Sequence, residues 1–203
     1  MLCMSNINEY CWLGRVGNFL SLDQETWIAS MKSRFQRVTS FPLTKEQERA
    51  WRNSFDVLQS ALTDMGDAYQ KLHLVFEYCL PMYPPRKDGT VSDYVVRADA
   101  ILVSADTAVV LEFKDRDDAI VHHARAARKY RSRLQKYHDE SVGMRKWSVL
   151  IPTLATDLCE RKLNRVTACS PDRLAEELVR QLGDHPKAHP DISRWRRSGY
   201  SQK

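Results

Sequence analysis

Apolar residues recur at helical spacing in the first part of the chain. Between Ser21 and Val38 they return about every four residues, which predicts a helix with Ser21 and Gln24 as its capping box. A second helix is predicted to begin at Thr44, where Thr44 and Gln47 form another capping box. Its buried stripe is predicted to consist of Trp51, Phe55, Leu58 and Leu62.

The pattern then changes to the alternation that is typical of strands. Residues 72–80, 96–103 and 108–114 each read as a strand. A long polar connection with Pro84, Pro85 and Gly89 separates the first two. Only four residues separate the second from the third, so these two strands are expected to form an antiparallel hairpin.

The remainder of the chain adds two helices and two strands. Residues 117–138 predict a long helix that is rich in Arg and Lys, followed by strands at 146–153 and 165–169. A final helix is expected after Ser170 and ends at Gly183. The order α, α, β, β, β, α, β, β, α predicts an α/β domain around a mixed central sheet.

Composition narrows the class of protein. The chain has 203 residues, 43% of them hydrophobic, which suits one domain with a sizeable core. No apolar run is long enough to span a membrane, and the N-terminus lacks the pattern of a secretory signal. The five scattered cysteines fit reduced thiols in a cytoplasm. A net charge of +5 weakly favours a polyanionic partner.

Three charged residues interrupt the apolar hairpin strands. Glu112 and Lys114 are two residues apart and therefore point to the same side of their strand, and Asp99 on the neighbouring strand is expected to project close to them. Two carboxylates that converge repel each other unless a cation lies between them. Asp99, Glu112 and the backbone carbonyl of Phe113 would suit Mg²⁺ or Mn²⁺, with Lys114 beside an attacking water.

A simpler interpretation of the same residues stays open. Asp99 would then end a turn, and Glu112 with Lys114 would form the solvated face of an edge strand. The spacing D-x(12)-E-x-K is common by chance, so the argument depends on its position within consecutive apolar strands.

The segments "RADAIL" and "VVLEFK", in this order of elements, resemble the core of the PD-(D/E)XK nuclease superfamily. Together with "LVFEYCLP", "YRSRLQKYHDES" and "VLIPT", they are most similar to the N-terminal nuclease-like domain of an uncharacterised bacterial family of helicase-linked proteins. The resemblance implies a restriction-endonuclease-like αβββαβ core at residues 44–183. Residues 1–43 are then a helical extension, and residues 184–203 a loosely packed basic tail.

The resemblance also implies roles for individual residues. Asp99 and Glu112 would bind the metal, Lys114 would act on the nucleophile, and Glu48 would be the additional acidic residue, with Glu77 as its rival. The long basic helix would contact nucleic acid through four residues of its middle part. These are Arg125, Arg128, Lys129 and Tyr130.

Two departures from the family pattern affect these expectations. Helicase-linked members have Gln-x-x-x-Tyr on this helix, and here Tyr130 is present while Ala126 stands at the Gln position. The sequence also contains no G-x-x-x-x-G-K-[ST] motif, so the chain is not itself the ATP-driven motor, and a helicase or ATPase would be a partner.

The expected function is that of a Mg²⁺- or Mn²⁺-dependent cytoplasmic nuclease that hydrolyses DNA or RNA without membrane association. Two alternatives belong to other classes. One is an inactive nucleic-acid-binding module of the same fold, as the missing Gln suggests, whose basic helix tracks a phosphate backbone. The other is a structural or regulatory domain that binds another protein.

Overall fold

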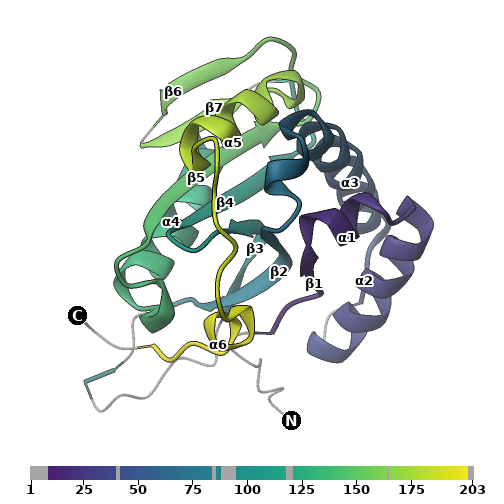
Figure 1. The fold of residues 1–203 in the computed structure, drawn as a ribbon. Coiled ribbons are helices and arrows are strands. Elements are labelled where there is room, and N and C mark those ends of the chain that lie inside the picture. Colours follow the sequence, from purple (N-terminus) through teal and green to yellow (C-terminus); the bar gives the residue numbers. More distant parts are fainter. Residues whose placement is uncertain are drawn as a thin grey trace.

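A seven-stranded mixed sheet forms the centre of the molecule (Figure 1). The computed structural model describes residues 9–39, 42–83, 86–87, 95–117, 121–163 and 165–200. The strand order is β1-β2-β3-β4-β5-β7-β6; β4–β5 and β5–β7 are parallel and the other pairs are antiparallel. The strands are β1 (Trp12–Arg15), β2 (His73–Pro81), β3 (Val95–Val103), β4 (Thr107–Lys114), β5 (Arg145–Pro152), β6 (Cys159–Leu163) and β7 (Val166–Cys169).

Helices cover both faces of this sheet. In Figure 1, α2 and α3 lie on one side of it and α4 on the other. The helices are α1 (Val16–Leu20), α2 (Gln24–Val38), α3 (Lys45–Met65), α4 (Val121–Lys136), α5 (Leu174–Leu182) and α6 (Ile192–Arg196). Short 3₁₀ turns occupy Asp67–Tyr69, Asp139–Ser141 and Pro171–Arg173. The predicted α/β class and the antiparallel β3–β4 hairpin are therefore confirmed.

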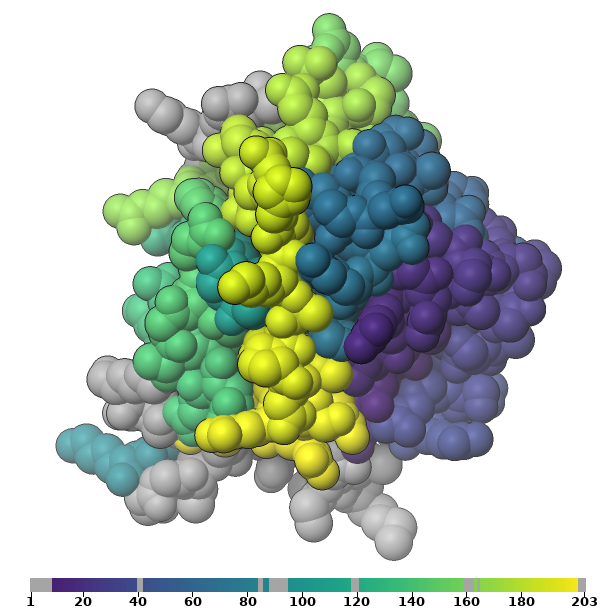
Figure 2. All heavy atoms as spheres, in the orientation of Figure 1, coloured from purple at the N-terminus to yellow at the C-terminus, as the bar shows by residue number. Residues whose placement is uncertain are grey.

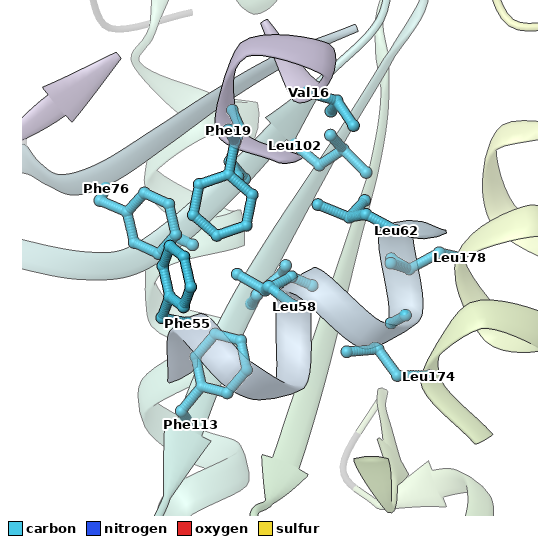
Figure 3. Packing of buried hydrophobic residues seen from close by; sticks show 14 of the residues in the cluster. Val16, Phe19, Phe55, Leu58, Leu62, Phe76, Leu102, Phe113, Leu174 and Leu178 are labelled. Atoms are coloured by element: carbon cyan, nitrogen blue, oxygen red, sulfur yellow. The ribbon is translucent and has the colours of Figure 1, made fainter. Parts of the chain in front are cut away.

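The larger core lies between the sheet and the helices α1, α2, α3 and α5. All four residues of the predicted stripe on α3 are buried. Figure 3 shows one of them, Phe55, beside Phe19 and Phe76, with ring centroids 4.9 Å apart for the pair Phe19–Phe55. Each such side chain contributes about 1.5–3 kcal/mol by leaving water, so this layer fixes α3 against the sheet.

Residues 1–43 were expected to form a helical extension, and the part of them that the structure describes packs together with the main sheet. Strand β1 pairs with β2 inside the main sheet. Trp27, Met31 and Phe35 of α2 are buried in the same core as α3. These described elements share one sheet and one core with the predicted domain, so they fold as part of it.

The tail after residue 183, which was predicted to be loosely packed, contains a tightly packed residue. Trp195 of α6 is fully buried and its ring stacks on Tyr78 of β2 with 5.3 Å between centroids. Its Nε1–H donates to Ser141 Oγ at 3.1 Å. Figure 2 shows this segment, in yellow, crossing one face of the molecule between green residues and blue and purple ones. The segment is rich in Pro, His and Arg and contains one tryptophan. A single apolar residue shows no periodicity, so the sequence did not predict that this segment packs on the core.

Helix boundaries differ from the sequence predictions in two places. Asp23, not Ser21, caps α2, because its Oδ1 accepts from Thr26 N at 2.9 Å. At the other end of the chain, Pro171–Arg173 forms a 3₁₀ turn before α5, and the hydroxyl of Ser170 bonds to Leu158 instead of capping a helix. The cap at Thr44 is confirmed by its bond from Gln47 N.

Four elements were not predicted: β1, α1, β6 and α6. Most of the predicted polar connection, at 84–85 and 88–94, lies outside the described residues, as do residues 118–120 of the predicted long helix. Within the described ranges, none of the helices has the length and apolarity that a membrane crossing requires.

Candidate functional site

The sheet forks where Asp99 lies. Pairing between β3 and β4 ends at Ala100↔Leu111. Beyond that point β3 remains paired with β2 as far as Val95, and β4 remains paired with β5 as far as Pro152. Asp99 is the first residue of β3 beyond the last β3–β4 pair, so its side chain lies where the two pairs of strands separate.

The Asp99 carboxylate substitutes for the missing strand pairing. Its Oδ2 accepts a hydrogen bond from the backbone N–H of Phe113 at 2.9 Å. A buried backbone N–H without a partner is costly, so this bond stabilises the branch point of the sheet. It also holds the carboxylate next to Glu112 and Lys114, because these residues flank Phe113 in the sequence.

The Lys114 ammonium lies among the three predicted metal ligands. Its Nζ is 2.8 Å from Glu112 Oε1 and 3.8 Å from Asp99 Oδ2. It also donates to the Phe113 carbonyl at 2.9 Å. The predicted convergence of Asp99, Glu112 and Lys114 is therefore present, with a cationic group in contact with both carboxylates.

Glu77 also belongs to this acidic group. It lies on β2, the strand that pairs with β3 beyond the fork. The register Phe76↔Ala100 and Tyr78↔Ala98 places Glu77 across from Asp99. The φ of Glu77 is +52°, an uncommon value for a residue other than glycine. Residues two apart in a regular strand point to the same face, but here Phe76 packs in the core beneath α3 and Tyr78 packs on the α4 side. The alternation of β2 is therefore interrupted at Glu77.

Three side chains that were not predicted as site residues hold the Glu77 carboxylate. Its Oε1 accepts from Trp51 Nε1 at 2.8 Å and from Gln47 Nε2 at 3.2 Å, both on α3. Its Oε2 is 3.5 Å from Arg97 Nε on β3. The signal in the sequence was Glu77 itself, a charge within an apolar strand; which residues would contact it depended on the packing of α3.

Burial dominates the electrostatics of the acidic residues. It raises the pKa of Glu112 to about 8, with Asp99 adding to the effect and Lys114 opposing it. It raises the pKa of Glu77 to about 7, again with a contribution from Asp99. The pKa of Asp99 is raised as well, by burial and against the attraction of Lys114. The Asp99 side chain is 31% exposed, so solvent screens its charge more than those of Glu112 and Glu77, which are 3% and 5% exposed.

Lys114 and Tyr130 respond to the same charges. Burial lowers the pKa of Lys114, but Asp99 and Glu112 outweigh it, so the pKa is raised and the ammonium stays charged. Burial raises the pKa of Tyr130, and the carboxylates of Glu112 and Asp99 raise it further. The phenol of Tyr130 on α4 is therefore close enough to the acidic group to feel its charge, and it remains protonated.

Glu48 does not belong to this group. Its carboxylate pairs with Lys32 Nζ at 2.8 Å and with Arg52 at 3.0 Å, and these contacts lower its pKa. Helical periodicity correctly placed Glu48 near the buried stripe, but basic residues one turn away and on α2 bind its side chain. Of the two acidic candidates, the structure brings Glu77 and not Glu48 to Asp99 and Glu112.

The four residues predicted to contact nucleic acid divide into two kinds. Arg125 and Arg128 are exposed on α4, whereas Lys129 and Tyr130 are half-buried. Ala126, at the position of the expected Gln, is half-buried too. The helix therefore presents positive charge to solvent on one side and directs Tyr130 towards the carboxylates on the other.

The residues at the fork fit a hard divalent cation in part. Glu112 Oε2 is buried and has no hydrogen-bond partner among the described residues. Oxygen ligands of this kind suit Mg²⁺, which keeps several waters and needs only one or two carboxylates. No cluster of three or more His, Cys, Asp or Glu side chains with metal-binding geometry occurs in the described part of the chain. The fit therefore rests on Asp99, Glu112 and the Phe113 carbonyl.

The raised pKa values predict a pH-dependent stability for the metal-free protein. In the unfolded chain a Glu side chain has a pKa of about 4.3. In the folded protein the pKa is raised to about 7 for Glu77 and to about 8 for Glu112. The folded state binds more protons in this window, so the free energy of unfolding should fall as the pH rises from about 4.3 to about 8.

Urea unfolding in the presence of a chelator, at several pH values across this window, measures the effect. The Glu112→Gln variant removes the group with the higher pKa and should show a clearly shallower dependence. Identical slopes for the variant and the parent protein would contradict the assignment of this titration to Glu112.

The fold and site define an α/β protein with a buried acidic group and a lysine at a fork of its mixed sheet. Comparison with known proteins gives no significant match to a family model, a curated protein or a solved structure.

Proposed function

We propose that the protein is a metal-dependent nuclease with a restriction-endonuclease-like core that hydrolyses phosphodiester bonds of DNA at the fork. The observation that supports this most strongly is the contact of the Lys114 ammonium with both Glu112 and Asp99. Structural ion pairs rarely place two or more buried carboxylates around one ammonium, because the desolvation cost is large. Perturbed groups of this kind occur preferentially at functional sites.

The chain's own residues have separable roles in this proposal. Asp99, Glu112 and the Phe113 carbonyl would hold Mg²⁺ or Mn²⁺, which supplies charge neutralisation and an acidified water. Lys114 orients the attacking water or offsets the charge that develops on the phosphate, and its raised pKa keeps it positive for this purpose. Glu77, held by Trp51 and Gln47 across β3 from Asp99, is the positioning residue beside the metal ligands.

Helix α4 provides the complementary contact with the substrate. The exposed guanidinium groups of Arg125 and Arg128 lie on the helix that directs Tyr130 towards the carboxylates. Contacts of such groups with phosphates give affinity that falls with salt concentration. A nucleic-acid backbone that follows α4 would therefore pass the acidic group.

An inactive nucleic-acid-binding module is the second candidate, and Ala126 is the observation that favours it. Incubation of the purified protein with linear, circular and single-stranded DNA, with and without Mg²⁺ or Mn²⁺, distinguishes the two. Metal-dependent cleavage supports the nuclease. Salt-sensitive binding without cleavage supports the module. Absence of both cleavage and binding would refute both candidates.

The two rival acidic residues give a matched pair of variants. Glu77→Gln should lower the cleavage rate by roughly 10–100-fold, as loss of a residue that orients metal ligands does. Glu48→Gln should leave the rate within about twofold, because Glu48 is engaged with Lys32 and Arg52. Initial rates at saturating metal measure both, and equal rates for the two variants would exclude the role given to Glu77.

We place the proposed activity in a reducing cytoplasm, next to a helicase or ATPase partner. Cys11 and Cys79 are buried free thiols, which supports a reducing, cytoplasmic environment. A helicase or ATPase partner follows from the family resemblance, since the chain has no nucleotide-binding motif of its own.

A further inference from the structure

Exposed apolar side chains lie at the open end of the fork. The N–H of Thr153 donates to the Lys114 carbonyl at 2.8 Å, and the N–H of Leu154 donates to the Arg116 carbonyl at 2.8 Å. These bonds lie just past the last β4–β5 pair, Lys114↔Pro152. The N–H of Ala155 donates back to the Pro152 carbonyl at 3.1 Å, so Leu154 lies in a turn at the end of β5, and it is 60% exposed.

Val121 adds a second apolar side chain at this end. It is the first residue of α4 and is 46% exposed. Helix α4 connects the parallel strands β4 and β5, so its N-terminus lies at the end of the sheet where β4 finishes. We call Leu154 and Val121, with the exposed Arg116 between β4 and α4, the mouth of the site.

The reacting groups are less exposed than the apolar side chains of the mouth. The Glu112 side chain is 4% exposed, and those of Lys114 and Asp99 are 28% and 31% exposed. The outside of a duplex presents charged phosphates and sugars, while its bases are stacked inside. Exposed leucine and valine would find no apolar partner on such a surface, and a rigid duplex cannot bend a phosphate towards groups that are less exposed than the side chains around them.

An unpaired strand satisfies both constraints. Its bases are free to lie on apolar side chains while the phosphate between them bends inward. We propose that Leu154 is a specificity-determining residue whose contact with an unpaired base directs the site to single-stranded DNA or unpaired ends. This inference rests on the proposed nucleic-acid site, and it adds the class of strand that the site accepts.

Fluorescence anisotropy tests the inference without turnover. The probes are a labelled single strand of about 20 deoxythymidines, which exceeds a typical single-strand site, and a blunt duplex of the same length, both measured in chelator. Leu154→Ala should weaken binding of the single strand by roughly five- to tenfold, the scale of one partly buried leucine. Duplex binding should change by less than about twofold, and Leu154→Met should retain most of the single-strand affinity.

Val142→Ala is the matched control, because Val142 is also exposed, at 57%, but precedes β5 at the opposite end of that strand. Unchanged single-strand affinity in Leu154→Ala, an equal loss on duplex, or an equal loss in Val142→Ala would overturn the inference. Metal-dependent cleavage by the parent protein is measured in parallel. Cleavage with no effect of Leu154→Ala rejects the inference alone, and absence of both cleavage and DNA binding rejects the proposed function with it.

Discussion

The Asp99→Asn variant is expected to lose cleavage of DNA by at least roughly 10²–10³-fold, the scale of removing one key electrostatic group from an active site. Asparagine has nearly the shape of aspartate, and its carbonyl oxygen still accepts the bond from Phe113 N that closes the fork. The substitution therefore removes the charge and leaves the local fold supported. Steady-state cleavage rates and the thermal midpoint, measured on the same preparation, separate the two effects.

Asp106→Asn is the matched control for this experiment. Asp106 lies in the turn at the other end of the same β3–β4 hairpin, where its exposed carboxylate pairs with Arg145 at 3.0 Å. Its substitution should leave cleavage within about twofold. Retention of full activity by a folded Asp99→Asn protein would exclude the proposed metal ligand.

Replacement of Trp195 by alanine should destabilise the protein by about 3–5 kcal/mol, the usual cost of deleting a fully buried tryptophan. Its side chain packs on Tyr78 and is among the buried residues of the core on the α4 side. The substitution also removes the donor to the hydroxyl of Ser141. Equilibrium unfolding in urea measures the difference in the free energy of unfolding.

Trp147→Ala provides the comparison, because Trp147 of β5 is 37% exposed and has less apolar surface to lose. Its cost should stay below about 1 kcal/mol. A cost for Trp195→Ala as small as that for Trp147→Ala would mean that the C-terminal segment does not stabilise the fold, as the sequence prediction of a loose tail implied.

Much of the fold followed from periodicity alone. The stripe from Trp51 to Leu62 predicted α3, because burial on one face of a helix imposes its period on the sequence. The apolar runs within residues 96–103 and 108–114 predicted β3 and β4. Strand β1 was missed because its four residues include Gly14 and Arg15 and show no alternation. The burial of Trp195 was missed because a single apolar residue produces no periodic pattern in the sequence.

The site was predictable where it depended on strand geometry. Asp99, Glu112 and Lys114 meet because they belong to a hairpin whose short turn fixed the pairing. The assignment of Glu48 failed, since the periodicity of a helix says which side a residue faces but not which partner its long side chain will bind. The position of Glu77 depends on a left-handed backbone within a strand, and no local pattern in the sequence announces that conformation.

The hydrogen bond from Phe113 N to Asp99 has a consequence for how this position would evolve. Because the bond closes the branch point of the sheet, selection for folding alone would preserve an acceptor at residue 99. A lineage without the proposed chemistry would thus change first at Glu112 and Lys114, whose side chains do not hold the N–H at the branch point. Retention of Asp99 alone would follow from its part in the fold, whereas retention of all three residues would support the proposed chemistry.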